Sequence, residues 1–350
     1  MTRDLLMLPR ALFLLALGSV VCVSASADEI RFVDGTSQKD CTVTEETFNT
    51  VVFTIKAGDS DIKQQRPARE VSSITYSKQP ANLTQGKALL ANGDYDGALS
   101  ALTAAQKEGP AWSKQHAFFY AAECQLAKGE GDAAVKTYEA LLTQFPNTRF
   151  RAEARLGQVR GMVMKKDLAG ARTALTAAEG EIKEKQLGPI FEMKAQLEGA
   201  RLAAAANDWK GALEKFGKVA TGAASFPDVV AEAKVGMAQG LAETGDHGRA
   251  ASELRPVLVA DNLPDHLAAK AYLILGDCHK KANKPREAAL AYLRVVVLYG
   301  GMPGEAPRAY WEAAKLIKGL PELGGDKRAA DLIDELKSRY PRSEWASKAI

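Results

Sequence analysis

Small and apolar residues recur along most of the chain at the spacing of one face of a helix. In the clearest stretch, residues 269–301, Tyr272 and Gly276 lie on one such face and Ala288 lies on a second. Pro285 separates the two faces, and proline fits the first turn of a helix because no N–H is needed there. The pattern predicts two antiparallel helices that are joined by a short turn and approach closely at small residues.

An alanine after a short turn recurs seven times between residues 79 and 350, at intervals of 36 to 41 residues. These alanines are Ala98, Ala134, Ala171, Ala212, Ala250, Ala288 and Ala329. A bulky residue follows each by four positions: Leu102, Tyr138, Leu175, Phe216, Leu254, Tyr292 and Ile333. Because a single hairpin cannot bury both of its apolar faces, we predict a mainly α fold, an α-solenoid of about seven stacked hairpins.

This order of small residue, turn, alanine and bulky residue resembles the tetratricopeptide repeat (TPR), a helix–turn–helix unit. In the clearest copy, Gly276 is the small residue and Tyr292 the bulky one. The third and seventh copies depart from the pattern, because Val159 and Ile317 replace the small residue. The resemblance implies a right-handed superhelix with a concave face over residues 79–350.

Residues 28–78 have a different pattern, made of short alternating or β-branched runs. These runs cover residues 29–33, 41–45, 50–55, 62–65 and 72–76. Five short strands in so little sequence predict a small β-barrel, since an open meander would leave long unpaired edges. The segment resembles SH3-like or Sm-like barrels, with their one-turn helix at residues 67–71. An irregular β-rich arm is the alternative, and the segment could either cap the first hairpin or be tethered by a flexible joint at residues 77–80.

Residues 1–27 have the three parts of a secretory signal peptide. Arg3 and Arg10 precede an apolar run over residues 11–23, and small residues follow as far as Ala27. The run is short for a membrane span, although an uncleaved anchor is the alternative. We expect cleavage near Ala27 and a periplasmic or secreted mature chain.

The cysteines do not indicate a specific chemical function. Cys22 does not favour a lipoprotein, because the preceding Val21 is not small. Cleavage would leave Cys41, Cys124 and Cys278, an odd number spread over different predicted units. We expect buried thiols that pack as small hydrophobic groups, with a bond from Cys41 to another chain as the alternative.

Composition and motifs exclude several classes of function. The chain is 46% hydrophobic and 25% charged, as in ordinary soluble proteins, and its formal net charge of +3 indicates no nucleic-acid-binding surface. The sequence contains no phosphate-binding loop, nucleophile elbow or histidine pair at metal-ligand spacing. We therefore expect no enzymatic activity and no cofactor; an enzyme without a recognisable motif is the remaining alternative.

In TPR proteins the first helix of each unit lines the concave groove, and the resemblance implies two lining rows here. The first row is Leu83, Phe119, Leu197, Val235 and Leu273. The second row, one helical turn further on, is Lys87, Glu123, Arg201, Gln239 and Asp277. An apolar row beside mixed charges suits an extended or helical peptide. The alternative is that these residues only pack or face water.

Together these patterns predict a scaffold of the cell envelope that binds a protein or peptide partner in the groove. A structural component of an outer-membrane assembly or a cell-division complex is the alternative. It is suggested by the aromatic-proline pairs Phe145-Pro146 and Tyr340-Pro341, which also suit ordinary helix ends. Peripheral contact with a membrane stays open.

Overall fold

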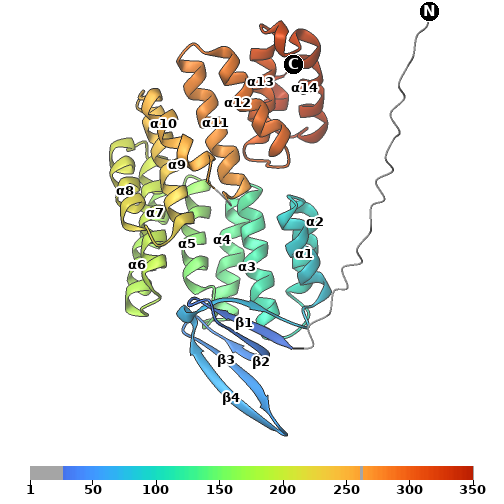
Figure 1. Ribbon diagram of the computed structural model, residues 1–350, viewed down its shortest axis with the longest axis vertical. Helices are drawn as coiled ribbons and strands as arrows, with labels where there is room; N and C mark the ends of the chain where they lie inside the picture. Colours follow the sequence, from blue (N-terminus) through green and yellow to red (C-terminus); the bar gives the residue numbers. More distant parts are fainter. Residues whose placement is uncertain (1–26, 261–262, 350) are drawn as a thin grey trace, which may run out of the picture.

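The computed structural model describes residues 27–260 and 263–349, so the predicted signal peptide lies almost wholly outside the described residues. An antiparallel sheet comes first and a stack of helical hairpins follows (Figure 1). No helix within the described ranges is long and apolar enough to cross a membrane.

The sheet contains the five predicted strands in the order β4-β3-β2-β1-β5. Their bounds are β1 (Asp28–Phe32), β2 (Ser37–Glu46), β3 (Thr50–Ala57), β4 (Ser60–Pro67) and β5 (Val71–Thr75). A one-turn 3₁₀ helix, η1 (Ala68–Glu70), precedes β5 as expected. Among the described residues no strand pairing joins β4 to β5, so the sheet has two edges and the closed barrel stays a prediction.

The Asp28 side chain connects the first strand to other parts of the sheet through hydrogen bonds. Its buried carboxylate accepts hydrogen bonds from the Val43 backbone N–H at 2.8 Å and from the Ser77 backbone N–H at 2.8 Å. The Ser77 hydroxyl donates a third at 3.0 Å. One side chain therefore ties β1 to β2 and to the segment after β5, beside the apolar core of Ile30 and Phe53.

The helices form the α-solenoid that the repeat predicts, and each hairpin pairs an odd-numbered first helix with an even-numbered second helix (Figure 1). The first helices are α1 (Ala81–Ala91), α3 (Ala111–Ala127), α5 (Arg151–Met164), α7 (Pro189–Ala205), α9 (Pro227–Glu243), α11 (Asp265–Lys281) and α13 (Ala306–Ile317). The second helices are α2 (Tyr95–Ala105), α4 (Gly131–Gln144), α6 (Leu168–Glu184), α8 (Trp209–Gly222), α10 (His247–Leu258), α12 (Pro285–Leu298) and α14 (Gly325–Arg339). The short helices η2 (Pro321–Leu323) and α15 (Glu344–Lys348) flank α14.

The predicted alanines and bulky residues form the core. All seven alanines are buried, and six of the seven bulky residues are buried with them. The exception is Ile333, whose place in the core is taken by Leu332 and Leu336. Each other second helix begins three residues before its alanine, whereas α14 begins at Gly325, four residues before Ala329. Leu332 and Leu336 follow Ala329 by three and seven positions, so all three lie on one face of α14.

The two copies that lack the small residue still form hairpins. Val159 and Ile317 are both fully buried. Val159 shares a core with Ala171 of the facing helix, and Ile317 does so with Ala329. The larger side chains therefore take part in the helix contact.

The sheet packs on the helices, and it does so at the second and third hairpins, not at the first as expected for a cap. Thr47 forms a backbone bridge with Thr148, and the Phe48 N–H donates to the Asn147 carbonyl at 3.1 Å. These contacts attach the β2–β3 turn to the loop between α4 and α5. In Figure 1 the sheet accordingly lies at the lower ends of α3 to α5.

Candidate functional site

Four residues of the predicted apolar row belong to the hydrophobic core. Leu83, Leu197, Val235 and Leu273 are 0%, 2%, 1% and 7% exposed. Each packs in a core cluster together with residues of second helices, as Leu83 does with Leu102. The assignment of these four to a lining row is therefore corrected, because the face they occupy is turned toward the neighbouring helices.

Phe119 is the member of that row that stays half-buried. Its ring stacks on Phe150 with centroids 4.3 Å apart, and it also lies near Tyr120 and Tyr138. The ring belongs to an aromatic cluster near the end of the solenoid that carries the sheet.

The second predicted row lies at the surface, and all of its members are half-buried. The Lys87 ammonium stands over the Tyr120 ring, 5.2 Å from its centroid. Gln239 borders a cavity. Glu123, Arg201 and Asp277 each take part in ion pairs between first helices of successive hairpins. The structure therefore places a row of paired charged side chains where the sequence predicted an apolar stripe with charged flanks.

The longest run of these ion pairs is a charge ladder formed by Glu123, Arg160, Glu198, Arg201 and Glu232. Arg160 donates to Glu123 at 3.0 Å, and its Nε lies 3.6 Å from the nearer Glu198 oxygen. Arg201 donates to Glu198 at 2.7 Å and also to Glu232. The charge ladder therefore joins α3, α5, α7 and α9 without a break. Sequence reasoning missed Arg160, Glu198 and Glu232. The signal that could have indicated them is that charged residues also occur one helical turn from the predicted rows.

Buried tyrosines connect this surface to the core. Tyr138 donates its hydroxyl hydrogen to Glu123. In the sixth hairpin Tyr292 donates to Asp277 at 2.7 Å, and Arg308 of α13 donates to the same oxygen at 2.6 Å. Burial and the neighbouring carboxylates raise the pKa of both tyrosines, which keeps them as neutral donors. A tyrosine that fills the core thus also orients a half-buried carboxylate at the surface of the first helices.

Two polar atoms of the charge ladder are left without a hydrogen-bond partner among the described residues: Oε2 of Glu198 and Nε of Arg160. Burial raises the pKa of Glu198 in spite of the two guanidinium groups beside it. Unsatisfied buried polar atoms carry a desolvation cost that a bound hydrogen-bonding group can remove.

A cavity of about 480 Å³ opens at the Glu232 end of the charge ladder. Its polar lining includes Arg201, Glu232, Gln239, His266 and Lys270, and its apolar lining includes Trp209, Phe216 and Val235. Within the described part of the chain, no carboxylate forms an ion pair with Lys270. Burial, followed by the positive charge of Arg201, lowers the pKa of Lys270. A free cation next to apolar walls is suited to a group that combines a negative charge with an apolar part.

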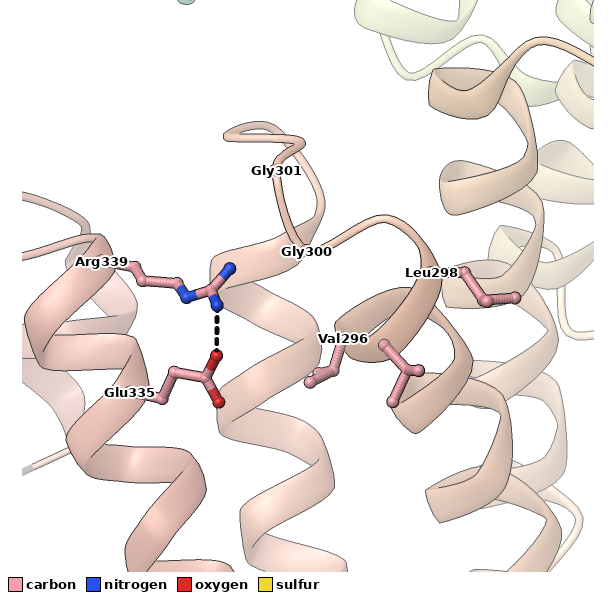
Figure 2. A pocket seen from close by; sticks show the side chains of 7 residues that line it. Val296, Leu298, Gly300, Gly301, Glu335 and Arg339 are labelled. Atoms are coloured by element: carbon pink, nitrogen blue, oxygen red, sulfur yellow. Dashed lines mark ion pairs between the residues drawn. The ribbon is translucent and has the colours of Figure 1, made fainter. Parts of the chain in front are cut away.

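A second cavity, about 400 Å³, lies between the end of α12 and α14. Figure 2 shows Glu335 and Arg339 on one side, paired at 2.9 Å, and Val296 and Leu298 on the other. Leu298 and Val297 are 62% and 68% exposed. This depression holds no set of converging reactive groups.

A buried polar cluster at the junction of sheet and helices was also missed by sequence reasoning. Glu46 of β2, whose side chain is 2% exposed, accepts hydrogen bonds from Tyr76 at 2.5 Å, from His116 at 3.1 Å and from Arg149. Burial alone would raise the pKa of Glu46, but its three partners hold that pKa at about 2. Burial lowers the pKa of His116, so the neutral ring donates its Nε2–H. The residues lie 30 to 103 positions from Glu46, and no local pattern could have grouped them.

Tyr76 and Trp112 stack beside this cluster with centroids 3.6 Å apart. The charges of the cluster are mutually compensated, so it serves to hold the sheet on the solenoid. Elsewhere, no group of three or more candidate ligands is placed to bind a metal ion within residues 27–260 and 263–349. Cys41, Cys124 and Cys278 are free and buried, as predicted, and burial raises the pKa of each thiol to about 11.

Comparisons with known proteins agree with the fold. Residues 83–148 and 235–315 match the model of the tetratricopeptide repeat family. No curated protein matches the chain.

Several solved structures have a similar arrangement of helices. The apo form of the quorum sensor NprR from B. thuringiensis is 14% identical, with a TM-score of 0.50 over 77% of this chain and 79% of that one. A tetratricopeptide repeat protein from Parabacteroides merdae ATCC 43184 is 15% identical, with a TM-score of 0.46 over 77% and 95% of the two chains. PilF of Pseudomonas aeruginosa is 13% identical, with a TM-score of 0.43 over 67% and 95%. At these identities the likeness concerns the fold alone.

Proposed function

We propose that this α-solenoid of TPR-like hairpins is a non-enzymatic scaffold that binds a segment of a protein partner on its concave surface. The observation that carries the proposal is the cavity at the end of the charge ladder, where Lys270 forms no ion pair with any described residue and Trp209 and Phe216 supply apolar walls. Most other charges of the surface are already paired within the chain. A partner therefore gains the most binding free energy at this end of the surface.

The cavity favours a peptide segment in which an acidic group lies beside an apolar side chain. The acidic group would pair with Lys270, whose desolvation is then compensated by an opposite charge. The apolar side chain of the peptide would cover Trp209 and Phe216. These two aromatic rings would supply most of the hydrophobic contact with the peptide.

Binding assays with the full mature chain test this proposal. Lys270→Glu reverses the free charge and should reduce capture of partners from envelope fractions roughly tenfold, since an opposed charge pair costs well over 1 kcal/mol. Lys136→Glu is the matched control, because Lys136 is exposed on the second helix α4, away from the cavity. Equal capture by both variants, measured by quantitative mass spectrometry, would rule out the cavity as the binding site.

The proposed location is the periplasm or the cell exterior. Its support is the basic, apolar and small-residue pattern of residues 1–27. Mass spectrometry of the native chain checks it: a mature N-terminus near Asp28 supports export, and an intact Met1 in the cytoplasm contradicts it.

A structural role in an outer-membrane or cell-division assembly is the second candidate. In this role the Glu46 cluster would attach the sheet to the solenoid. The surface of the sheet and the surface of the helices would then keep a constant orientation relative to each other. The aromatic-proline pairs give it no support, because Phe145 and Tyr340 are ordinary helix ends. Co-purification with membrane proteins or peptidoglycan favours this role, and a purely soluble set of partners opposes it.

A further inference from the structure

Strand β4 forms one edge of the sheet, and within the residues that the structure describes no strand pairs with its outer side. On its inner side it pairs with β3 along its whole length, from Ala57 with Ser60 to Thr50 with Pro67. The side chains of β4 are mostly exposed, and in Figure 1 β3 and β4 extend below the helices, away from the solenoid. An edge of this kind offers unpaired backbone groups to another strand.

The backbone groups that face outward from β4 are those of Asp61, Lys63 and Gln65. Immediately beyond the last pair of the β3–β4 ladder, the Ala68 N–H donates to the Asn49 carbonyl at 2.9 Å. In an antiparallel ladder every second residue forms such bonds, so the even-numbered residues of β4 bond to β3. The odd-numbered residues therefore direct their N–H and C=O groups away from the sheet.

The side chains along this edge are self-complementary about Ile62. Asp61 and Lys63 flank it and lie on the opposite face of the sheet. If a second copy of β4 runs antiparallel with Ile62 opposite its own counterpart, each Asp61 lies opposite Lys63 of the other copy. Ile62, which is 44% exposed, also pairs with Ile55 of β3. The isoleucines of two copies would therefore form one apolar row across the joined sheets.

Neighbouring registers that bring the same backbone groups together are poorer. A register centred on Lys63 places two lysines directly opposite each other, which is destabilising. A register centred on Gln64 places Ile62 opposite Arg66. Charges on an edge strand normally oppose pairing, but in the register centred on Ile62 each charge meets the opposite one. The edge is therefore protected against most strands and matched to a second copy of itself.

We propose that β4 of one copy pairs with β4 of a second copy about a two-fold axis at Ile62. The two sheets then form one continuous sheet. Each of the two pairs of Asp61 with Lys63 exchanges two backbone hydrogen bonds, and the two side chains of each pair have opposite charges. Because the paired strands are short, the expected species is a weak dimer that exchanges with the monomer.

Charge reversal in the full mature chain tests the pairing. Asp61→Lys and Lys63→Asp each replace two opposite-charge pairs by two like-charge pairs, so each should raise the dimer dissociation constant roughly tenfold. An equimolar mixture of the two variants should recover native association, because opposite charges face each other again in the heterodimer. Lys39→Asp is the control, since Lys39 is exposed on β2, away from this edge. Sedimentation equilibrium measures all four samples.

Disulfide formation tests the register. Ile62→Cys places two thiols directly opposite each other at a pair without backbone hydrogen bonds, where Cα atoms about 4.5 Å apart allow a disulfide. Gln64→Cys is the control, because it lies on the same face of β4 but four residues along the edge from its counterpart. The described native cysteines are all buried, so the introduced thiol is the accessible one. Oxidation should link copies of Ile62→Cys much faster than copies of Gln64→Cys.

Three results would overturn the proposal. The first is a native chain that sediments only as a monomer; protection of the β4 amides from hydrogen exchange by another envelope protein would then assign the edge to a foreign strand. The second is association that both charge reversals leave unchanged, which would place the dimer contact on another surface. The third is equal disulfide formation in the two cysteine variants. None of them bears on whether Lys270→Glu reduces partner capture, so the dimer and the proposed binding site are tested separately.

Discussion

At the scale of single residues, the turn inside each hairpin depends on one backbone conformation. A residue with positive φ precedes the cap of the second helix in hairpins one to six, and in four of them the cap is an aspartate whose carboxylate accepts an N–H from the first turn. Glycine or asparagine suits the positive φ because neither is strongly strained there. Lys166 is the exception, with φ +65°.

Replacing Lys166 by glycine should therefore stabilise the protein. The left-handed conformation costs a lysine about 1 kcal/mol, and glycine removes that strain. Denaturant unfolding should give a free energy of unfolding higher by about this amount. Lys165→Gly is the matched control, since its φ of −82° carries no such strain, and it should not stabilise.

Glu305 should make stability depend on pH. Its pKa is raised to about 7 from the ordinary 4.5, chiefly by burial. The folded chain therefore holds this proton more tightly than the unfolded chain, and the free energy of unfolding falls as pH rises from 4.5 to about 7. In Glu305→Gln this contribution, about 1–2 kcal/mol after allowance for partial exposure, should disappear. Urea unfolding of both proteins on either side of this window checks it; an unchanged pH profile would contradict the assignment.

At the scale of helices, close contact depends on glycine facing an aromatic ring. Gly276 of α11 faces Tyr292 of α12, and Gly236 of α9 faces Phe216 of α8. The first pair joins two helices of one hairpin, whereas the second joins two successive hairpins. A glycine opposite an aromatic ring therefore sets the distance between helices both within and between repeat units. The ring can lie against the facing helix only where no Cβ intervenes.

Gly276→Ala should destabilise the sixth hairpin in spite of alanine's better helix propensity. The added Cβ would lie 2.5 Å from the Tyr292 ring, and relief of that overlap costs about 1–3 kcal/mol. Gly180→Ala in α6 is the control, because a Cβ there meets nothing within 4 Å. That change should stabilise by about 0.5–1 kcal/mol. Thermal unfolding of the two variants should shift in opposite directions, and shifts of the same sign would show that the contact is looser than described.

At the scale of the whole molecule, one buried acid holds the sheet on the solenoid. Glu46, whose own side chain is buried, compensates the charge of Arg149 and accepts hydrogen bonds from Tyr76 and His116. Removal of one partner from a buried ionic cluster costs more than the pair contributes, since the remaining charge stays buried.

Glu46→Ala should therefore loosen the sheet. We expect a loss of about 3 kcal/mol at the junction, seen as faster amide hydrogen exchange in β2 and in the loop between α4 and α5. Glu45→Ala is the control, because Glu45 is the exposed neighbour on the same strand. Equal exchange in both variants would show that the apolar contacts alone, such as Tyr76 on Trp112, hold the sheet.

The spacing of alanines and bulky residues was enough to predict the hairpins, their number and the stacked α-solenoid, because helical periodicity is a local property and the buried face repeats with it. The strands before them were predicted for a similar reason, because the alternation of side chains along a strand is also a local property. The groove-lining row was wrong at Leu83, Leu197, Val235 and Leu273, since a small rotation of a helix exchanges a lining position for a core position.

The charge ladder, the Glu46 cluster and the contact of the Tyr95 hydroxyl with the Met302 sulfur depend on long-range packing. Apart from Glu198 and Arg201 on one helix, the paired residues lie about 30 to 103 positions apart, or 207 for Tyr95 and Met302, and they meet only when the hairpins and the sheet pack against one another. Each hairpin's internal geometry follows from its own residues. The angle at which one hairpin stacks on the next sets which charges face each other, and that angle arises from the packing of whole helices against one another.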